Sequence, residues 1–167
     1  DTNPSNSFSL NTFKRVFAPD SYRLNGSKNL EEYSKTFAQD IEQKINEFKK
    51  ENIGFAGIIL CPFFANEGFP NLPTGWLEPA QKIIKKHGGI IIADEVQPGF
   101  GRLGSSMWSH DIIGIQPDIV TIGKPMANGH PVGALITNYN FISEFRNKYR
   151  YFNTFGGNPV SCAASLS

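Results

Sequence analysis

Four short, largely apolar runs, separated by segments with helical periodicity, are the feature that most constrains the fold of this 167-residue chain. A strand that is apolar at nearly every residue is buried on both faces, whereas a strand with one solvated face alternates apolar and polar residues. Buried strands that alternate with helices are typical of α/β proteins. The chain is therefore predicted to form a mostly parallel sheet with helices on both faces. The predicted strands are residues 57–60, 90–93, 118–122 and 133–137.

The segments between these runs carry the three-to-four-residue spacing of amphipathic helices. The clearest covers residues 29–50, where Asn29 followed three residues later by Glu32 resembles a capping box. Residues 1–30 lack such periodicity and are predicted to be a connecting segment. The other predicted helices cover residues 76–87, residues 141–149 and a segment that begins near residue 158 with Pro159 at its first helical position.

Charge and cysteine content exclude several classes of protein. The formal net charge of +1 argues against a nucleic-acid or anionic-membrane partner that binds through bulk charge, and no apolar stretch is long enough to span a bilayer. Cys61 and Cys162 form neither a disulfide framework nor a metal-ligand spacing. We therefore expect no metal and a reduced, cytoplasmic setting, with the mitochondrial matrix as the alternative.

Polar residues follow two of the predicted strands. Asp94 and Glu95 come after residues 90–93, and Lys124 comes after residues 118–122. In open parallel sheets, ligands bind beyond the carboxyl ends of the strands, so Asp94 and Lys124 are expected to face one crevice. A lysine that forms a Schiff base with the aldehyde of pyridoxal 5'-phosphate (PLP), and a carboxylate that keeps its pyridine nitrogen protonated, are what this cofactor requires.

Position alone leaves other interpretations open. A single aspartate after a strand is more often a turn or cap residue, and a single lysine is usually on the surface. A nucleotide phosphate loop does not fit Gly123-Lys124, because Asp118 stands where that motif needs glycine and Pro125 where it needs Ser or Thr.

The residues around this pair form ordered motifs. They are IADEVQPGFGRLG at 92–104, PDIVTIGK at 117–124 with NGHPVGA at 128–134, and NTFGGNP at 153–159. Over about residues 54–167, the chain resembles the class III (subgroup II) aminotransferases. The resemblance implies a fold-type I (aspartate aminotransferase-like) protein in which residues 29–167 are part of the large PLP-binding domain. The family's phosphate cup would precede the chain, and its C-terminal small domain would follow.

The same resemblance implies roles for single residues. Asp94 would pair with the pyridinium nitrogen, Val96 would lie near the ring and Gln97 would bind the phenolic oxygen. Lys124 would form the Schiff base and shuttle a proton. Thr154 would bind the phosphate in the neighbouring subunit's site, which implies a homodimer or higher oligomer with shared active sites. As alternatives, Gln97 and Thr154 would be ordinary loop and turn residues.

The expected activity is a PLP-dependent transaminase that moves an amino group between an amino acid or amine and a keto acid. The motifs look closest to the branch that contains alanine–glyoxylate aminotransferase 2 and the phospholyases acting on phosphoethanolamine and phosphohydroxylysine, so a phospholyase is an alternative. A non-catalytic relative is another, because residues 61–65 (CPFFA) replace the family's Glu-Pro-x-Gln-Gly. The isolated chain is expected to be inactive.

Overall fold

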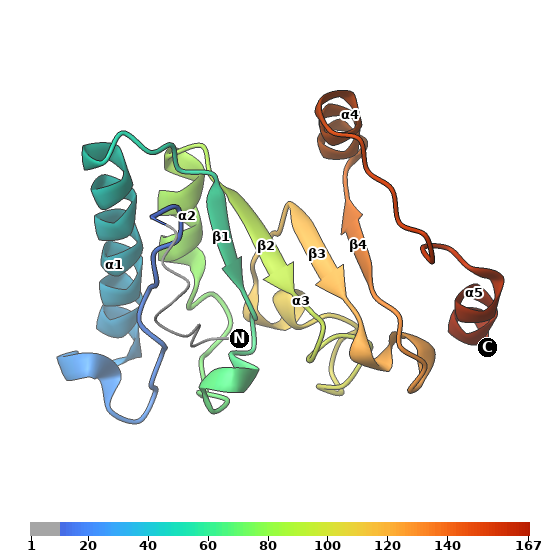
Figure 1. The fold of residues 1–167 in the computed structure, drawn as a ribbon. Coiled ribbons are helices and arrows are strands. Elements are labelled where there is room, and N and C mark those ends of the chain that lie inside the picture. The colour runs from blue at the N-terminus through green and yellow to red at the C-terminus, as the bar shows by residue number, and fades with distance from the viewer. Residues whose placement is uncertain (1–10) are drawn as a thin grey trace.

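A four-stranded sheet forms the centre of the computed structural model, which describes residues 11–167 (Figure 1). The strands lie in the order β1-β2-β3-β4; the first three are parallel, and β4 is antiparallel to β3. The predicted α/β fold with a mostly parallel sheet is confirmed. The strands are β1 (Gly57–Leu60), β2 (Ile90–Asp94), β3 (Ile119–Ile122) and β4 (Ala134–Thr137).

The orientation of β4 follows from the length of the chain before it. A parallel crossover needs a dozen or more residues and usually a full helix. The segment between β3 and β4 is shorter and contains only the 3-10 turn η3 (Lys124–Ala127). The chain therefore reverses direction, and β4 pairs with β3 as an antiparallel edge strand.

The register of β2 against β3 is fixed by Asp118, the residue before β3. Its N–H donates to the Ile91 carbonyl (2.8 Å), and its carboxylate accepts the Ile91 N–H (2.7 Å). Burial by itself would raise the pKa of Asp118, but the Lys85 ammonium and the Ile91 N–H hold that pKa below its ordinary value. In this register Asp94 lies opposite Thr121.

The long predicted helices are present. Asn29 caps α1 by accepting the Glu32 N–H (2.9 Å), and Asn158 caps the last helix by accepting the Ser161 N–H (3.0 Å). Helix α3 was not predicted. The helices are α1 (Leu30–Lys50), α2 (Glu78–Lys86), α3 (Ser109–Ile113), α4 (Tyr139–Lys148) and α5 (Pro159–Leu166), with 3-10 turns η1 (Leu24–Gly26) and η2 (Ala65–Glu67) in addition to η3.

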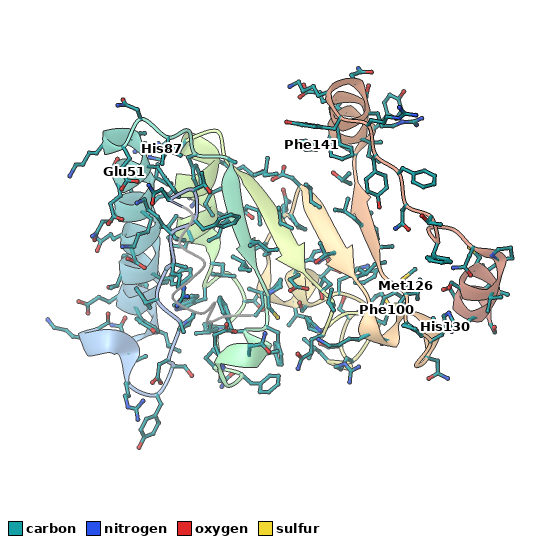
Figure 2. All side chains as sticks on the ribbon, viewed as in Figure 1. Glu51, His87, Phe100, Met126, His130 and Phe141 are labelled. Carbon is teal, nitrogen blue, oxygen red and sulfur yellow. The ribbon has the colours of Figure 1, made fainter. Side chains whose placement is uncertain are left out.

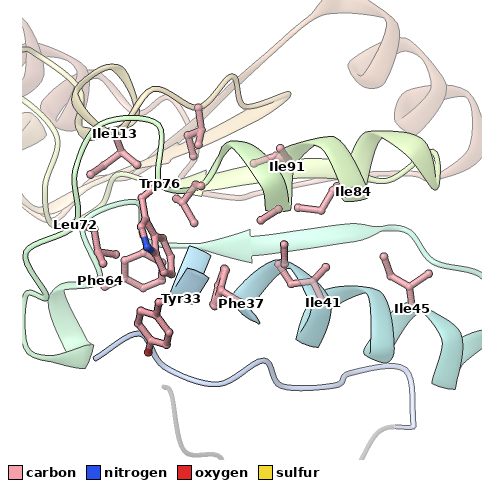
Figure 3. Close-up of a cluster of buried hydrophobic side chains, with 14 residues drawn as sticks. Tyr33, Phe37, Ile41, Ile45, Phe64, Leu72, Trp76, Ile84, Ile91 and Ile113 are labelled. Carbon is pink, nitrogen blue, oxygen red and sulfur yellow. The ribbon is translucent and has the colours of Figure 1, made fainter. Parts of the chain in front are cut away.

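The core lies between α1, α2 and one face of the sheet (Figure 3). The buried stripe of α1 includes Phe37, whose ring packs against Phe17, Phe64 and Trp76. The indole nitrogen of Trp76 donates to the Leu30 carbonyl (2.9 Å), so this ring satisfies its polar atom while packing in the core.

Helices on both faces of the sheet were predicted, but in residues 11–167 the helical cover is found on the face that carries Ile91. Strand register places Ile59 and Leu135 on the opposite face, where they are 59% and 55% exposed. Apolar strands indicate that both faces favour burial, but they do not say which segment covers each face.

Truncating Phe37 tests this core. The Phe37→Ala variant should lose about 3–5 kcal/mol of unfolding free energy, because a large ring leaves a cavity among three aromatic neighbours. Urea unfolding followed by tryptophan fluorescence, to which Trp76 and Trp108 both contribute, would measure this loss. Lys35→Ala, at an exposed position of the same helix, is the control; an equal loss in both variants would contradict the packing described.

Candidate functional site

The parallel strands β2 and β3 end at the same edge of the sheet and bring two predicted site residues there. Asp94 is the last residue of β2, and Lys124 follows β3 after Gly123. The turns beyond the two strands are in contact, because a Cβ built on Gly123 would lie 3.4 Å from Cγ1 of Val96. Asp94, Val96 and Lys124 are thus brought to one edge.

Figure 2 shows which residues lie at this edge. Phe100, Met126 and His130 lie at the end of the sheet where β2 and β3 finish, whereas Glu51 and His87 lie at the opposite end.

Lys124 is exposed and adopts a left-handed backbone conformation with φ of 31°. A non-glycine residue held there is strained, and such residues cluster at functional sites.

Among residues 11–167, hydrogen bonds reach one oxygen of the Asp94 carboxylate. Its Oδ1 accepts the Val96 N–H (3.0 Å) and the Thr121 hydroxyl (3.3 Å). Among residues 11–167, no hydrogen bond reaches the other oxygen, Oδ2. The half-buried side chain lies on the face of the sheet that the helices leave open. One oxygen therefore sets the orientation of the carboxylate, and the other is available to a ligand.

Glu95, the next residue, has the opposite environment. Its carboxylate is fully buried and accepts the N–H and hydroxyl of Ser109 (3.1 and 2.8 Å) and the N–H of His110 (2.8 Å). The His110 Nδ1 lies 2.8 Å from the same carboxylate. Burial alone would raise the pKa of Glu95, but these hydrogen bonds outweigh burial and hold that pKa below its ordinary value.

These bonds tie the segment that follows β2 to the start of α3. The Glu95 N–H continues the sheet by donating to the Thr121 carbonyl (2.9 Å), while its side chain holds α3. Gly99 packs so closely that a Cβ there would lie 2.7 Å from the Glu95 carbonyl. The loop that carries Val96 and Gln97 is thus held at both ends. This role of Glu95 was not predicted, although the two-residue period of a strand places Glu95 with Ala93 on the buried face, where a carboxylate needs hydrogen-bond donors.

Cys61 lies at the end of β1, one strand away from Asp94. Burial raises the pKa of its thiol, the N–H groups of Ala65 and Phe63 lower it, and the nearby Asp94 charge adds to the rise. The net effect keeps the thiol protonated at neutral pH. Where the family motif places a glutamate, this chain therefore presents a neutral group.

The other two predicted residues differ in position. Gln97 is half-buried in the turn after β2, beside Val96. Thr154 is exposed in the segment between α4 and α5, which runs on the far side of β4 from β2 (Figure 1). Helix α5 is joined to the turn after η3 by a hydrogen bond between His130 Nε2 and Ser161 Oγ (2.9 Å). The fold brings Gln97 to the edge with Asp94 and does not bring Thr154 there, so both roles stay predictions.

Residues 11–167 lack the features of two other kinds of site. None of the helices there has the length and apolar character needed to cross a membrane. The same residues contain no group of three or more His, Cys, Asp or Glu side chains that could hold a metal ion.

Comparison with protein families and curated proteins gives a consistent result. The model of the class-III aminotransferases matches residues 3–167. The chain is 38% identical over 135 residues to ethanolamine-phosphate phospho-lyase homolog 1 of Caenorhabditis elegans, covering 80% of this chain and 29% of that protein. It is 39% identical over 127 residues to human mitochondrial alanine–glyoxylate aminotransferase 2, covering 73% of this chain and 25% of that protein. The chain thus spans well under a third of the length of these relatives.

Solved structures share the fold. A phospholyase from Arthrobacter in complex with phosphoethanolamine superposes with a TM-score of 0.81 at 37% identity, over 92% of this chain and 36% of that one. The omega transaminase from Pseudomonas jessenii in complex with PMP superposes with a TM-score of 0.86 at 29% identity, over 97% of this chain and 37% of that one. The sheet described above therefore matches part of fold-type I transaminase structures.

The buried carboxylate of Glu95 predicts a pH-dependent contribution to stability. A folded-state pKa below the ordinary 4.5 means that its stabilisation is fully present above pH 4.5 and is lost as the pH falls through the folded-state value. Glu95→Gln should therefore lower the free energy of unfolding by about 2 kcal/mol at neutral pH. This gap in unfolding free energy between the variant and the unsubstituted protein should close as the pH falls.

Thermal unfolding at a series of pH values would measure this gap. Glu31→Gln, at an exposed glutamate that pairs with Lys35, is the matched control and should show little difference at any pH. A gap between Glu95→Gln and the unsubstituted protein that is constant from neutral pH into acid would contradict the role given to the Glu95 charge.

Proposed function

The chain belongs to the class-III aminotransferase family, and we propose that the natural protein containing residues 1–167 is a PLP-dependent transaminase whose cofactor binds at the edge formed by β2 and β3. Its substrates would be an amino acid or amine as donor and a keto acid as acceptor. The proposal rests mainly on Asp94 Oδ2, which accepts no hydrogen bond from residues 11–167 and lies at the same edge as Lys124.

The residues at this edge fit PLP. The cofactor's pyridine N–H needs an anionic acceptor, and Asp94 offers one oxygen that no hydrogen bond from the described part of the chain reaches. Its aldehyde needs a lysine amine, and the exposed Lys124 lies beyond the neighbouring strand. Gly123 and Val96 are neighbours at this edge, because a Cβ on Gly123 would lie 3.4 Å from Val96 Cγ1, and both are apolar residues that a flat ring would pack against.

Each residue would then have a defined task. When bound, PLP withdraws electrons from the substrate and makes the proton on its Cα acidic. Asp94 would accept the pyridine N–H through Oδ2, and Gln97 would donate to the phenolic oxygen. Lys124 would hold the aldehyde carbon and, once displaced by substrate, would take the proton from the substrate Cα and deliver it to the C4′ atom of the cofactor. Thr154 would bind the phosphate in the site of a second copy, which makes the functional unit a dimer.

A phospholyase is the second candidate. Two similar proteins bear that activity in their names, one at 38% and one at 37% identity. The chemistry would begin in the same way, with Lys124 taking the Cα proton. The electron pair left on Cα would then form a double bond to the next carbon as the bond from that carbon to the phosphate oxygen breaks, so phosphate would leave and no proton would be added at C4′. The neutral thiol of Cys61, in place of the family's glutamate, would repel an anionic phosphate less than a carboxylate would.

Replacing Lys124 tests the cofactor site. Lys124→Ala should abolish the visible absorbance band of lysine-bound PLP and reduce turnover by at least about 10³-fold, because the chain would lose both its covalent attachment and its proton carrier. Spectra of the natural protein after addition of PLP would show this. Lys148→Ala, at an exposed lysine of α4, should keep the band. A band that persists in Lys124→Ala would contradict the proposal.

Substrate choice separates the two candidates. The holoenzyme incubated with phosphoethanolamine alone should release no inorganic phosphate if it is a transaminase, whereas an amino donor with a keto acid should be consumed in equal amounts. Phosphate release without keto-acid consumption would identify the lyase and contradict the transaminase assignment. Assays of both products on the same preparation make the comparison.

A further inference from the structure

The hydroxyl of Thr121 has a position that no part of the proposed mechanism yet uses. Thr121 lies opposite Asp94 in the parallel register of β2 and β3, on the face left open by the helices. Its Oγ1 donates to Asp94 Oδ1 at 3.3 Å, and its carbonyl accepts the Glu95 N–H at 2.9 Å. One residue therefore contacts both carboxylate-bearing residues at the end of β2.

The Asp94 carboxylate has two donors, and they act on the same oxygen. The Val96 N–H donates to Oδ1 from the turn that follows β2, and the Thr121 hydroxyl donates from the next strand. A single hydrogen bond would leave the carboxylate free to rotate about its Cβ–Cγ bond, which is a broad torsion. Two donors on different elements fix both the plane of the group and the direction of Oδ2.

We propose that Thr121 is a positioning residue for the cofactor: its hydroxyl orients Asp94 so that Oδ2 faces the pyridine nitrogen of PLP. The inference rests on the proposed function, because it assigns a role within the same site. In this role Thr121 would act through its hydrogen bond to Asp94 and not through contact with the cofactor or the reacting atoms. Its effect should therefore appear in cofactor binding and in the protonation of the pyridine nitrogen before any substrate is present.

Thr121→Val in the natural protein removes the hydroxyl and keeps the branched shape of the side chain. The apoprotein should bind PLP about tenfold more weakly, since a hydrogen bond to a charged group is lost. With ¹⁵N-labelled PLP, the pyridine nitrogen signal should move toward that of the unprotonated ring. Thr121→Ser, which keeps the hydroxyl, should restore both the affinity and the signal.

Thr137→Val is the matched control. Thr137 lies on the same face of the sheet, and its hydroxyl donates to the Asp118 carbonyl (2.9 Å), two strands away from Asp94. Its removal should leave PLP affinity within about twofold, as expected for a site without shared partners. Melting temperatures of the apoproteins would separate loss of orientation from loss of folding, and Thr121→Ala replaces the valine variant if that one does not fold.

The outcomes are distinct. Unchanged affinity and an unchanged nitrogen signal in the folded Thr121→Val or Thr121→Ala variant would overturn the inference and leave the proposed function standing. An equal loss of PLP affinity in Thr121→Ser and Thr121→Val would also overturn the inference, because the loss would then come from packing and not from the hydroxyl. Failure of the unsubstituted protein to bind PLP through Lys124 would overturn the proposed function and this inference with it.

Discussion

The parallel register between β2 and β3 is the constraint on which the site depends. Asp118 sets it at the start of β3 through two hydrogen bonds with the main chain of Ile91. At the other end, the same register places Thr121 opposite Asp94 and lets the Thr121 carbonyl accept the Glu95 N–H. A slip of one residue would turn every side chain of one strand to the other face. Asp94 would then point into the helix-covered side, away from the edge that carries Lys124.

Side chains along β2 alternate between the two faces of the sheet, and this gives two neighbouring carboxylates different environments. Glu95 follows Ala93 on the buried face, where the start of α3 satisfies its carboxylate with hydrogen bonds. Asp94 lies on the open face, where residues 11–167 hold one oxygen and give the other no hydrogen bond. Glu95 holds the loop that carries Val96 and Gln97, and Asp94 is the acid proposed to bind the cofactor. Burial thus separates a structural carboxylate from a half-exposed one at two neighbouring residues.

Much of the fold and part of the candidate site could be predicted from the sequence, because apolar runs and helical periodicity are local signals. The strands, the long helices and the shared edge of Asp94 and Lys124 follow from them. Helix α3 could not be predicted, because five residues carry too little periodicity and their start is capped by Glu95 from a distant segment. The hydroxyl of Thr121 looks like ordinary strand composition until the register is known. The helical cover of the second face could not be assigned, because apolar strands indicate burial without indicating which segment provides it. The role of Thr154 stays a prediction.

The most direct test of the central claim is a crystal structure of the natural protein with PLP bound. The account predicts continuous density between the Lys124 amine and the C4′ atom of the cofactor, with Asp94 Oδ2 within hydrogen-bonding distance of the pyridine nitrogen and Oδ1 still bound to Val96 and Thr121. PLP attached to a different lysine, or a pyridine nitrogen that faces a group other than Asp94, would contradict it.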